Sequence, residues 1–357
     1  MSGRAAKRWV ALLGTLLALS LGVGTAADAT AGGTPTASVP TANAPVVKKV
    51  VGKGTPASCT ETALFAAVRT GGSITFNCGP NPVTIKITKT LRTCNTHNCK
   101  HPWEGGKPLT AMTLDGGGKV TLSGGGKVGI YYANSCEESF GWLSSRCDKD
   151  ATLQVTFKNL TFVSGNATKG VPDKESVGGG GGGGAIAMRG NKLTVVNSTF
   201  KSNVCVKAHS DAGGGAIRVV GVKSVKISGS TFSGNKCANG GAISSLGSPM
   251  SISTSTITGN AATGSGASSG KGGNGGGVYF DGASQNVTIS STKITKNKAG
   301  KGGGGSGVFY VSNNRGGTLT IKGSTVTGNT GEAFWTGSRH DLFYLGKKLS
   351  ISSSTIS

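Results

Sequence analysis

Acidic side chains are scarce in this sequence. Its 357 residues include 14 Asp and Glu against 37 Lys and Arg, which gives a formal net charge of +23. From residue 212 onward the only acids are Asp281, Glu332 and Asp341. Calcium sites usually need two or more carboxylates, and glycoside hydrolysis needs a carboxylate pair on one face. The chain contains no Asp-Asp or Asn-Thr-Asp phrase, so neither chemistry has a recognisable site.

Other absences narrow the class of protein further. The eight Cys include no Cys-x-x-Cys spacing, which argues against a zinc site. The glycine run at 178–184 is not followed by Gly-Lys-Ser/Thr, so it is interpreted as a flexible loop rather than a phosphate-binding loop. Glycine is abundant, with 63 residues, but it shows no Gly-X-Y period, which excludes collagen. These patterns predict no cofactor.

The one long apolar run lies at the N-terminus. Arg4, Lys7 and Arg8 precede the apolar residues 9–23, and small residues follow at 26, 27 and 29. This pattern predicts a cleaved signal peptide over residues 1–29, and hence a secreted protein. Residues 30–56 are rich in Thr, Ala and Pro and are predicted to form a flexible linker. Residues 57–357 are predicted to fold as one domain, with no transmembrane segment after signal cleavage.

Two short phrases alternate along this domain. Gly-Gly-Ala-Ile occurs at 183–186, 214–217 and 240–243, and looser versions begin at residues 275, 305 and 331. Ser-Thr-Phe-x-x-Asn occurs at 198–203 and 230–235 and continues in looser form at 255–260, 291–297 and 324–329. Short strands with alternating apolar positions lie between the phrases, whereas length variation is confined to the glycine-rich segments. A constant strand with variable loops predicts an all-β solenoid, a parallel β-helix.

The repeated Asn residues are predicted to be structural. Equivalent residues on neighbouring parallel strands lie about 4.8 Å apart, so stacked Asn side chains can bond one another in a ladder. The ladder residues are Asn203, Asn235, Asn260, Asn297 and Asn329. Cys205 and Cys237 each follow their Asn by two positions, which predicts a disulfide between successive rungs. An even set of Cys in an exported chain predicts local pairs as well: Cys59–Cys78, Cys94–Cys99 and Cys136–Cys147.

The two ends of the solenoid are expected to differ. Residues 58–61 fit a capping box, and the apolar residues after them predict a short helix that covers the N-terminal end and stops at Gly71-Gly72. At the other end, residues 354–357 stop partway through a Ser-Thr-Phe-like phrase. The loop 339–346 is a candidate cover for that end. Without a cover, the open C-terminal rung leaves unpaired strand edges, which invite self-association.

The alternation of Gly-Gly-Ala-Ile with Phe-x-x-Asn, as at 200–203 and 232–235, resembles the polymorphic outer-membrane-protein repeat. More broadly, the chain is similar to the pectin-lyase-like right-handed β-helix superfamily, and this resemblance implies that the coil is right-handed. Residues 59–79, followed by residues 113–118, resemble the start of many secreted bacterial members. The resemblance also implies an enzymatic option, a pectate-lyase-like polysaccharide lyase, and calcium is expected only under that option. The familiar motifs of that enzyme group are absent here.

A candidate binding surface lies on the strands that contain the Gly-Gly-Ala-Ile phrase. If Ile186 and its equivalents face inward, the next residue of each rung faces outward, and the last three of these are aromatic. Exposed rings beside basic residues suit sugar rings that carry carboxylates or sulfates. Packing beneath the loops 261–274 and 298–306 is the alternative interpretation. The residues predicted to bind ligand are Arg189, Arg218, Tyr279, Asp281, Phe309 and Trp335.

Two classes of function remain. The first is a non-catalytic extracellular adhesin or binder of acidic polysaccharide, and the second is a polysaccharide lyase or hydrolase that acts on an acidic glycan. The isolated acids favour the first, and no catalytic residue is identified. Arg339-His340-Asp341, the one cluster of titratable side chains near the repeats, is interpreted as a loop. The basic charge predicts an acidic polysaccharide or cell-wall polyanion as the partner, and no specific nucleic acid.

Overall fold

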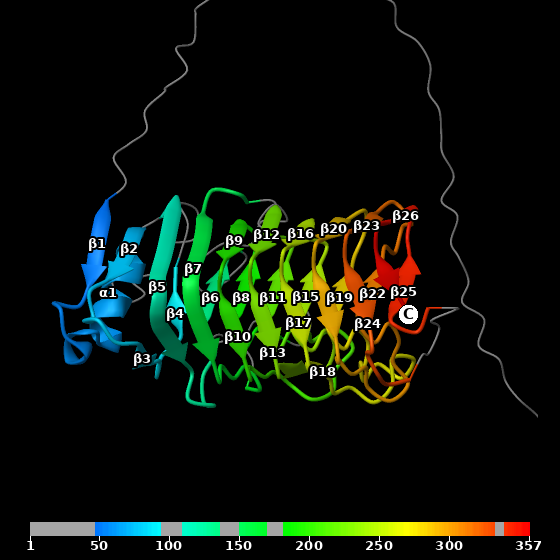
Figure 1. Cartoon of the computed structure of the whole chain (residues 1–357), viewed down its shortest axis with the longest axis horizontal. Coiled ribbons are helices and arrows are strands. Elements are labelled where there is room, and N and C mark those ends of the chain that lie inside the picture. The colour runs from blue at the N-terminus through cyan, green and yellow to red at the C-terminus, as the bar shows by residue number, and fades with distance from the viewer. Residues whose placement is uncertain (1–46, 94–108, 136–149, 170–180, 333–338) are drawn as a thin grey trace, which may run out of the picture. The chain divides into compact units, whose positions relative to one another are not determined.

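The computed structural model describes residues 47–93, 109–135, 150–169, 181–332 and 339–357. Their strands stack side by side along one coil, from β1 at one end to β26 at the other (Figure 1). Sheet A contains β1 (Lys48–Val51), β2 (Gly72–Phe76), β3 (Val83–Lys86), β5 (Ala111–Ser123), β7 (Gln154–Val163), β9 (Lys192–Val196), β10 (Thr199–Lys201), β12 (Ser224–Ser228), β13 (Thr231–Ser233), β16 (Met250–Ser253), β17 (Thr256–Thr258), β20 (Asn286–Ser290), β21 (Lys293–Thr295), β23 (Thr318–Lys322), β24 (Thr325–Thr327), β26 (Lys348–Ser352) and β27 (Thr355–Ile356).

Sheet B forms the opposite wall of the coil. It contains β4 (Leu91–Arg92), β6 (Tyr131–Asn134), β8 (Ile186–Arg189), β11 (Ile217–Val220), β15 (Ile243–Leu246), β19 (Val278–Asp281), β22 (Val308–Val311) and β25 (Leu342–Leu345). A small sheet C contains β14 (Lys236–Cys237) and β18 (Ala261–Ala262). One rung is one turn of the coil, with a sheet B strand followed by two sheet A strands, as in β8, β9 and β10.

Each strand pairs in parallel with the equivalent strand of the next rung. In sheet B, Ile217 pairs with Ile186 on one side and with Ile243 on the other. The strands of sheet A alternate between buried and more exposed residues, as period-2 geometry requires. The predicted parallel solenoid with repeated rungs is therefore confirmed.

The interior of the coil is filled by stacked equivalent side chains. Phe162, Phe200 and Phe232 lie one above another, with ring centroids 4.8 and 4.6 Å apart and nearly parallel planes. In the following rungs Ile257 and Ile294 take the same position, and all five side chains are fully buried. The aromatic residue of the Ser-Thr-Phe phrase is thus a core residue, which explains why aliphatic residues replace it in the looser versions.

The N-terminal end is covered by helix α1 (Glu61–Thr70), as the sequence predicts, but its cap is different. The N-cap is Thr60, whose hydroxyl accepts a hydrogen bond from the backbone N–H of Ala63 at 3.1 Å, whereas Ser58 belongs to a short 3-10 helix, η1 (Pro56–Ser58). The predicted Cys59–Cys78 disulfide is present. Strand β1 lies within the segment 30–56, which is predicted to be a flexible linker, and it pairs with β2. Ordered structure therefore begins earlier in the chain than expected.

The C-terminal rung also departs from the prediction. Strand β25 pairs with β22 so that Phe343 lies beside Phe309, the place in the row that the sequence analysis gives to Trp335. Trp335 itself lies outside the described residues. Residues 342–345, predicted to be part of a covering loop, instead form a strand of sheet B. The sheet B strand that follows β22 in the stack is therefore β25.

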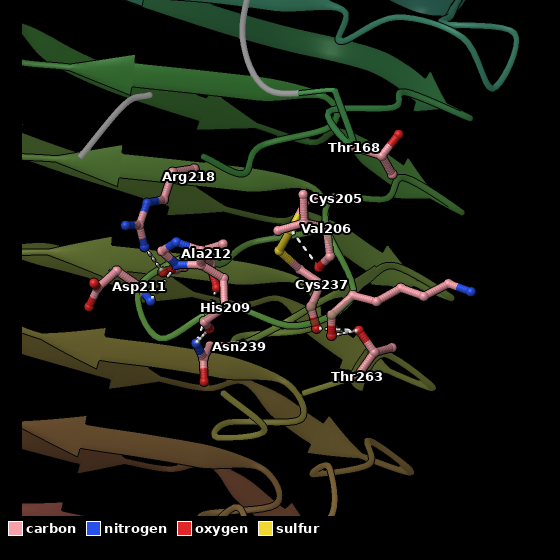
Figure 2. Close-up of a disulfide and its surroundings, with 12 residues drawn as sticks. Thr168, Cys205, Val206, His209, Asp211, Ala212, Arg218, Cys237, Asn239 and Thr263 are labelled. Carbon is pink, nitrogen blue, oxygen red and sulfur yellow. Dashed lines mark hydrogen bonds between the residues drawn. A yellow bond between two sulfur atoms is a disulfide. The ribbon is translucent and has the colours of Figure 1, made fainter. Parts of the chain in front are cut away.

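The Cys205–Cys237 disulfide joins two successive rungs, as predicted, with a Cα–Cα distance of 4.7 Å. Figure 2 shows this disulfide with the loop that carries His209 and Asp211. The side chain of Asn239 holds that loop, since its Nδ2 donates to the carbonyl oxygens of His209 and Ala212 at 3.2 and 3.1 Å. The predicted pairs Cys94–Cys99 and Cys136–Cys147 lie outside the described residues.

Candidate functional site

The two described rings of the predicted aromatic row, Tyr279 and Phe309, are buried. Parallel register aligns Ala187, Arg218, Ser244, Tyr279 and Phe309 on successive sheet B strands, and none of them belongs to the main core inside the coil. Tyr279 is nevertheless only 4% exposed and Phe309 only 6%. The expectation of an exposed row is therefore wrong for these two rings, which pack outside the main core. They stack on each other with centroids 5.3 Å apart, so the row is a packing feature.

Asp281 binds its own neighbours on this face. The hydroxyl of Tyr279 donates to one of its carboxylate oxygens at 2.8 Å, and the side-chain amide of Asn313 donates to the other at 3.0 Å. Burial, together with the charge and hydrogen bond of Asp281, raises the pKa of Tyr279 well above its ordinary value. Tyr279 therefore stays a neutral hydrogen-bond donor at neutral pH.

Arg218 is fully buried, although it lies on the outside of the coil wall. Its Nη1 donates to Ser244 Oγ at 2.6 Å, and Figure 2 shows it beside the loop that carries Asp211. Burial lowers the pKa of Arg218 to about 10, against the smaller opposing effect of nearby Tyr279, Asp211 and Asp281. Arg218 is thus still charged at neutral pH, but it is not available at the surface. Arg189 lies at the end of β8 and is partly exposed.

The repeated Asn residues form a continuous ladder of buried side chains. The Nδ2 of each donates to the Oδ1 of the next at 2.8 to 2.9 Å, from Asn203 through Asn235, Asn260 and Asn297 to Asn329. Each Oδ1 also accepts from the backbone N–H of the preceding Asn at 2.9 to 3.0 Å. These amides hold the turn that follows the second sheet A strand of each rung.

Asp341 occupies the end of this ladder. Its Oδ2 accepts from Asn329 Nδ2 at 2.9 Å, the position that another Asn oxygen would take. The hydroxyl of Ser357 donates to the same oxygen at 3.1 Å, and His340 Nδ1 lies 3.2 Å from the other carboxylate oxygen. The hydrogen bond to Asp341, and then that to the carbonyl oxygen of Gly331, raise the pKa of His340. This cluster is therefore the terminus of a structural ladder.

The same three side chains do not have the geometry of a nucleophilic triad. In a triad the serine hydroxyl bonds the histidine, and the carboxylate orients that histidine from the far side. Here Ser357 bonds the carboxylate, and the second ring nitrogen of His340 faces the Gly331 carbonyl oxygen at 2.9 Å. Across the described ranges, no group of three or more His, Cys, Asp or Glu is placed to hold a metal ion. No helix among them is long and apolar enough to cross a membrane.

The outward side of sheet A carries two regular columns of hydroxyl groups. Register from β7 to the last rung aligns one column on the first strand of each rung and another on the second. In each column a single lysine replaces one hydroxyl residue. The first column is Thr156, Thr194, Lys226, Ser251, Thr288, Thr320 and Ser350, and the second is Thr161, Thr199, Thr231, Thr256, Lys293, Thr325 and Thr355.

Charge on this side of the sheet has one sign. From β7 onward the sheet A strands contain no Asp, Glu or Arg, and their outward residues include seven lysines: Lys158, Lys192, Lys201, Lys226, Lys293, Lys322 and Lys348. Lys158 lies 3.7 Å from Asp115 on β5, and no described acid pairs with the other six. The outward residues of these strands also include no aromatic ring. We call this surface, from β7 to β27, the lysine–hydroxyl face.

Residues 115–347 match the family model for the right-handed β-helix region, which spans more than half of the chain. The chain belongs to the right-handed β-helix family. No curated protein and no solved structure matches it significantly.

Membership of the right-handed β-helix family confirms the predicted class and handedness of the coil. It supports the broader likeness to pectin-lyase-like proteins, whereas the narrower likeness to polymorphic outer-membrane-protein repeats stays a prediction. The match begins at Asp115, so β1 and α1 precede it, and it includes most rungs of the lysine–hydroxyl face. The family is associated with polysaccharide-related or adhesin-like roles in general, and the match to it identifies no ligand.

Proposed function

We propose that this protein is a secreted, non-catalytic binder of acidic polysaccharide, an adhesin-like protein that contacts its ligand through the lysine–hydroxyl face. The observation that carries the proposal is the charge of that face, with seven outward lysines and no acid on the sheet A strands from β7 onward. A surface of one charge sign attracts polymers of the opposite sign and speeds their association. The proposed binding surface therefore lies on sheet A, whereas the described binding residues predicted from the sequence lie on sheet B.

The chemistry of the face suits a polyanion with hydroxyl groups. Lysines supply compact, mobile charges, while the Ser and Thr hydroxyls between them donate and accept hydrogen bonds. Arg, which suits bidentate pairing with single carboxylates, is absent from these strands. Aromatic platforms for stacking on neutral sugar rings are absent from their outward side as well. Binding is therefore expected to depend on charge and salt more than on ring stacking.

The test is the affinity of the purified full chain for polygalacturonate, a carboxylated polysaccharide, with neutral dextran as the control ligand. If about four lysines engage, the affinity should fall roughly 10- to 100-fold between about 50 and 200 mM salt, because bound counterions are released on association. Dextran should not bind. A protein that binds both polymers equally, or that binds polygalacturonate without salt dependence, would contradict the proposal.

Two matched variants separate the face from net charge. One carries Lys192→Gln, Lys226→Gln, Lys322→Gln and Lys348→Gln on the face. The other carries Lys127→Gln, Lys207→Gln, Lys271→Gln and Lys301→Gln, all exposed residues outside the sheet A strands. Both lose four charges, but only the first should lose at least about tenfold in affinity, since the contacts are local. Equal losses would mean that net charge alone attracts the polymer.

The same incubation tests the enzymatic alternative. A lyase would release unsaturated oligosaccharides from polygalacturonate, which absorb ultraviolet light, and a hydrolase would release reducing ends. Neither product is expected to accumulate over the course of the binding experiment. Accumulation of either in proportion to protein concentration would replace the binder with an enzyme.

A further inference from the structure

Six of the seven lysines of the lysine–hydroxyl face fall into two groups of neighbouring rungs along the coil, called clusters here, and the seventh, Lys158, lies beside Asp115. The first consists of Lys192, Lys201 and Lys226, on β9, β10 and β12. The second consists of Lys293, Lys322 and Lys348, on β21, β23 and β26. All six side chains are at least partly exposed, and none has an acidic partner within the described ranges.

An uncharged band separates the two clusters. The outward residues of β16 and β17 are Ser251, Ser253, Thr256 and Thr258, and those of β20 are Asn286, Thr288 and Ser290. These side chains are short and polar, so they offer hydrogen bonds without a barrier of bulk or opposite charge. The band therefore joins the clusters along the coil instead of dividing the face into unrelated patches.

The spacing of the strands sets the size of ligand that could use both clusters. Lys226 on β12 and Lys322 on β23 are separated by three strand-to-strand steps, through β16 and β20. At about 4.8 Å per step, these two lysines lie roughly 14 Å apart along the coil. Lys293 on β21 is nearer, since its rung lies two steps, or roughly 10 Å, from the rung of Lys226. A polymer lying parallel to the strands would meet one cluster, whereas a polymer lying along the coil would cross both.

We propose that the face holds one unbranched anionic chain that runs along the coil and engages both lysine clusters at once, an inference that rests on the proposed function. Engagement of the first cluster makes contact with the second an intramolecular event, which increases the overall affinity without any new kind of contact. The ligand class is a linear polysaccharide with a negative charge on each repeat and enough length to span the uncharged band.

The experiment measures the binding of two oligogalacturonides of defined length to the full chain. One is shorter than about 10 Å, and the other is clearly longer than the distance of about 14 Å between Lys226 and Lys322 along the coil. Three double variants are used: Lys192→Gln with Lys226→Gln, Lys322→Gln with Lys348→Gln, and the exposed loop control Lys271→Gln with Lys301→Gln. Circular dichroism checks that each variant keeps the fold. Affinities are measured at one fixed salt concentration.

The wild-type chain should bind the long oligomer at least about tenfold more tightly than the short one. Either double variant of the face should bind the long oligomer with nearly the affinity that the wild-type chain has for the short one. Its affinity for the short oligomer should fall about twofold or less, because the other cluster still binds that oligomer. The loop control should leave both affinities unchanged.

Several outcomes would overturn the inference while leaving the proposed function intact. One is equal affinity for both lengths, and another is a loss confined to the variant of one cluster, which would place the bound chain parallel to the strands. If neither oligomer nor the parent polymer binds the wild-type chain at all, the proposed function itself fails. The two failures are thus distinguishable.

Discussion

The outward sides of sheets A and B belong to the same coil and obey the same alternation, yet they have opposite characters. On sheet B the outward residues Arg218, Tyr279 and Phe309 are buried. On sheet A, from β7 onward, the outward residues are mostly Ser, Thr and Lys, and they remain partly or fully exposed. Strand register decides which way a side chain points, but exposure depends on whether another part of the chain packs over it.

This difference separates stability from binding. An aromatic ring or a charged group that is removed from water contributes through packing and hydrogen bonds, and its loss is felt in the free energy of unfolding. A solvated Thr or Lys on a strand contributes little to that free energy, but it remains available to a ligand. Substitutions on the two faces should therefore affect different measurements.

The largest effect is expected from Tyr279→Ala. Tyr279 stacks on Phe309 and donates to Asp281, so its truncation should lower the free energy of unfolding by about 3–5 kcal/mol, as for other buried aromatic residues. Its matched control is Thr288→Ala on the outward side of β20, which should change that free energy by less than about 0.5 kcal/mol. Denaturant unfolding measures both. Comparable losses from the two substitutions would show that the faces do not differ in the way described.

A smaller effect is expected at the corner where the sheets meet, at the end of the Asn ladder. Asp341→Ala should cost about 1–3 kcal/mol, because the buried Nδ2 of Asn329 would lose its acceptor. Asp341→Asn keeps an amide oxygen in that place and should restore most of the loss. Unfolding curves of the two variants test this role. If Asn is as harmful as Ala, the negative charge of Asp341, and not its place in the ladder, stabilises the last rung.

The fold could be predicted from the sequence because particular residues that each rung needs recur at fixed positions in the repeat. The Asn of each rung follows its strand at a constant spacing. Cys205 and Cys237 each follow the Asn of their own rung by two positions. These constraints survive insertions in the loops, since the insertions fall elsewhere in the rung. The positions of the ladder and of the rung-to-rung disulfide therefore follow from spacing alone.

The site could not be predicted in the same way, for two physical reasons. Strand alternation predicts which way Tyr279 and Phe309 point, but it does not report whether those side chains are buried. The phrase at 331–334 predicts the last rung, but strand pairing places Phe343 next to Phe309. The hydroxyl columns had a usable signal, because outward positions in the sheet A strands read Thr, Ser or Lys in rung after rung. That signal lies in the sheet A strands, whereas the described residues predicted to bind ligand lie on the strands of sheet B.

The smallest effect is a dependence of the last rung on pH. The pKa of His340 is raised above its ordinary value of 6.5, because its charged form interacts with Asp341 and the Gly331 carbonyl. The resulting stabilisation is fully present below the ordinary pKa and is lost as the pH rises through the raised, folded value. Local opening free energies from hydrogen exchange should therefore decrease between acidic and mildly alkaline pH at the Asn329 amide, whose N–H faces Asp341. The amide of Thr288, in the middle of sheet A, should show no such change. His340→Gln should abolish the dependence at Asn329, and an unchanged dependence in that variant would assign it to another group.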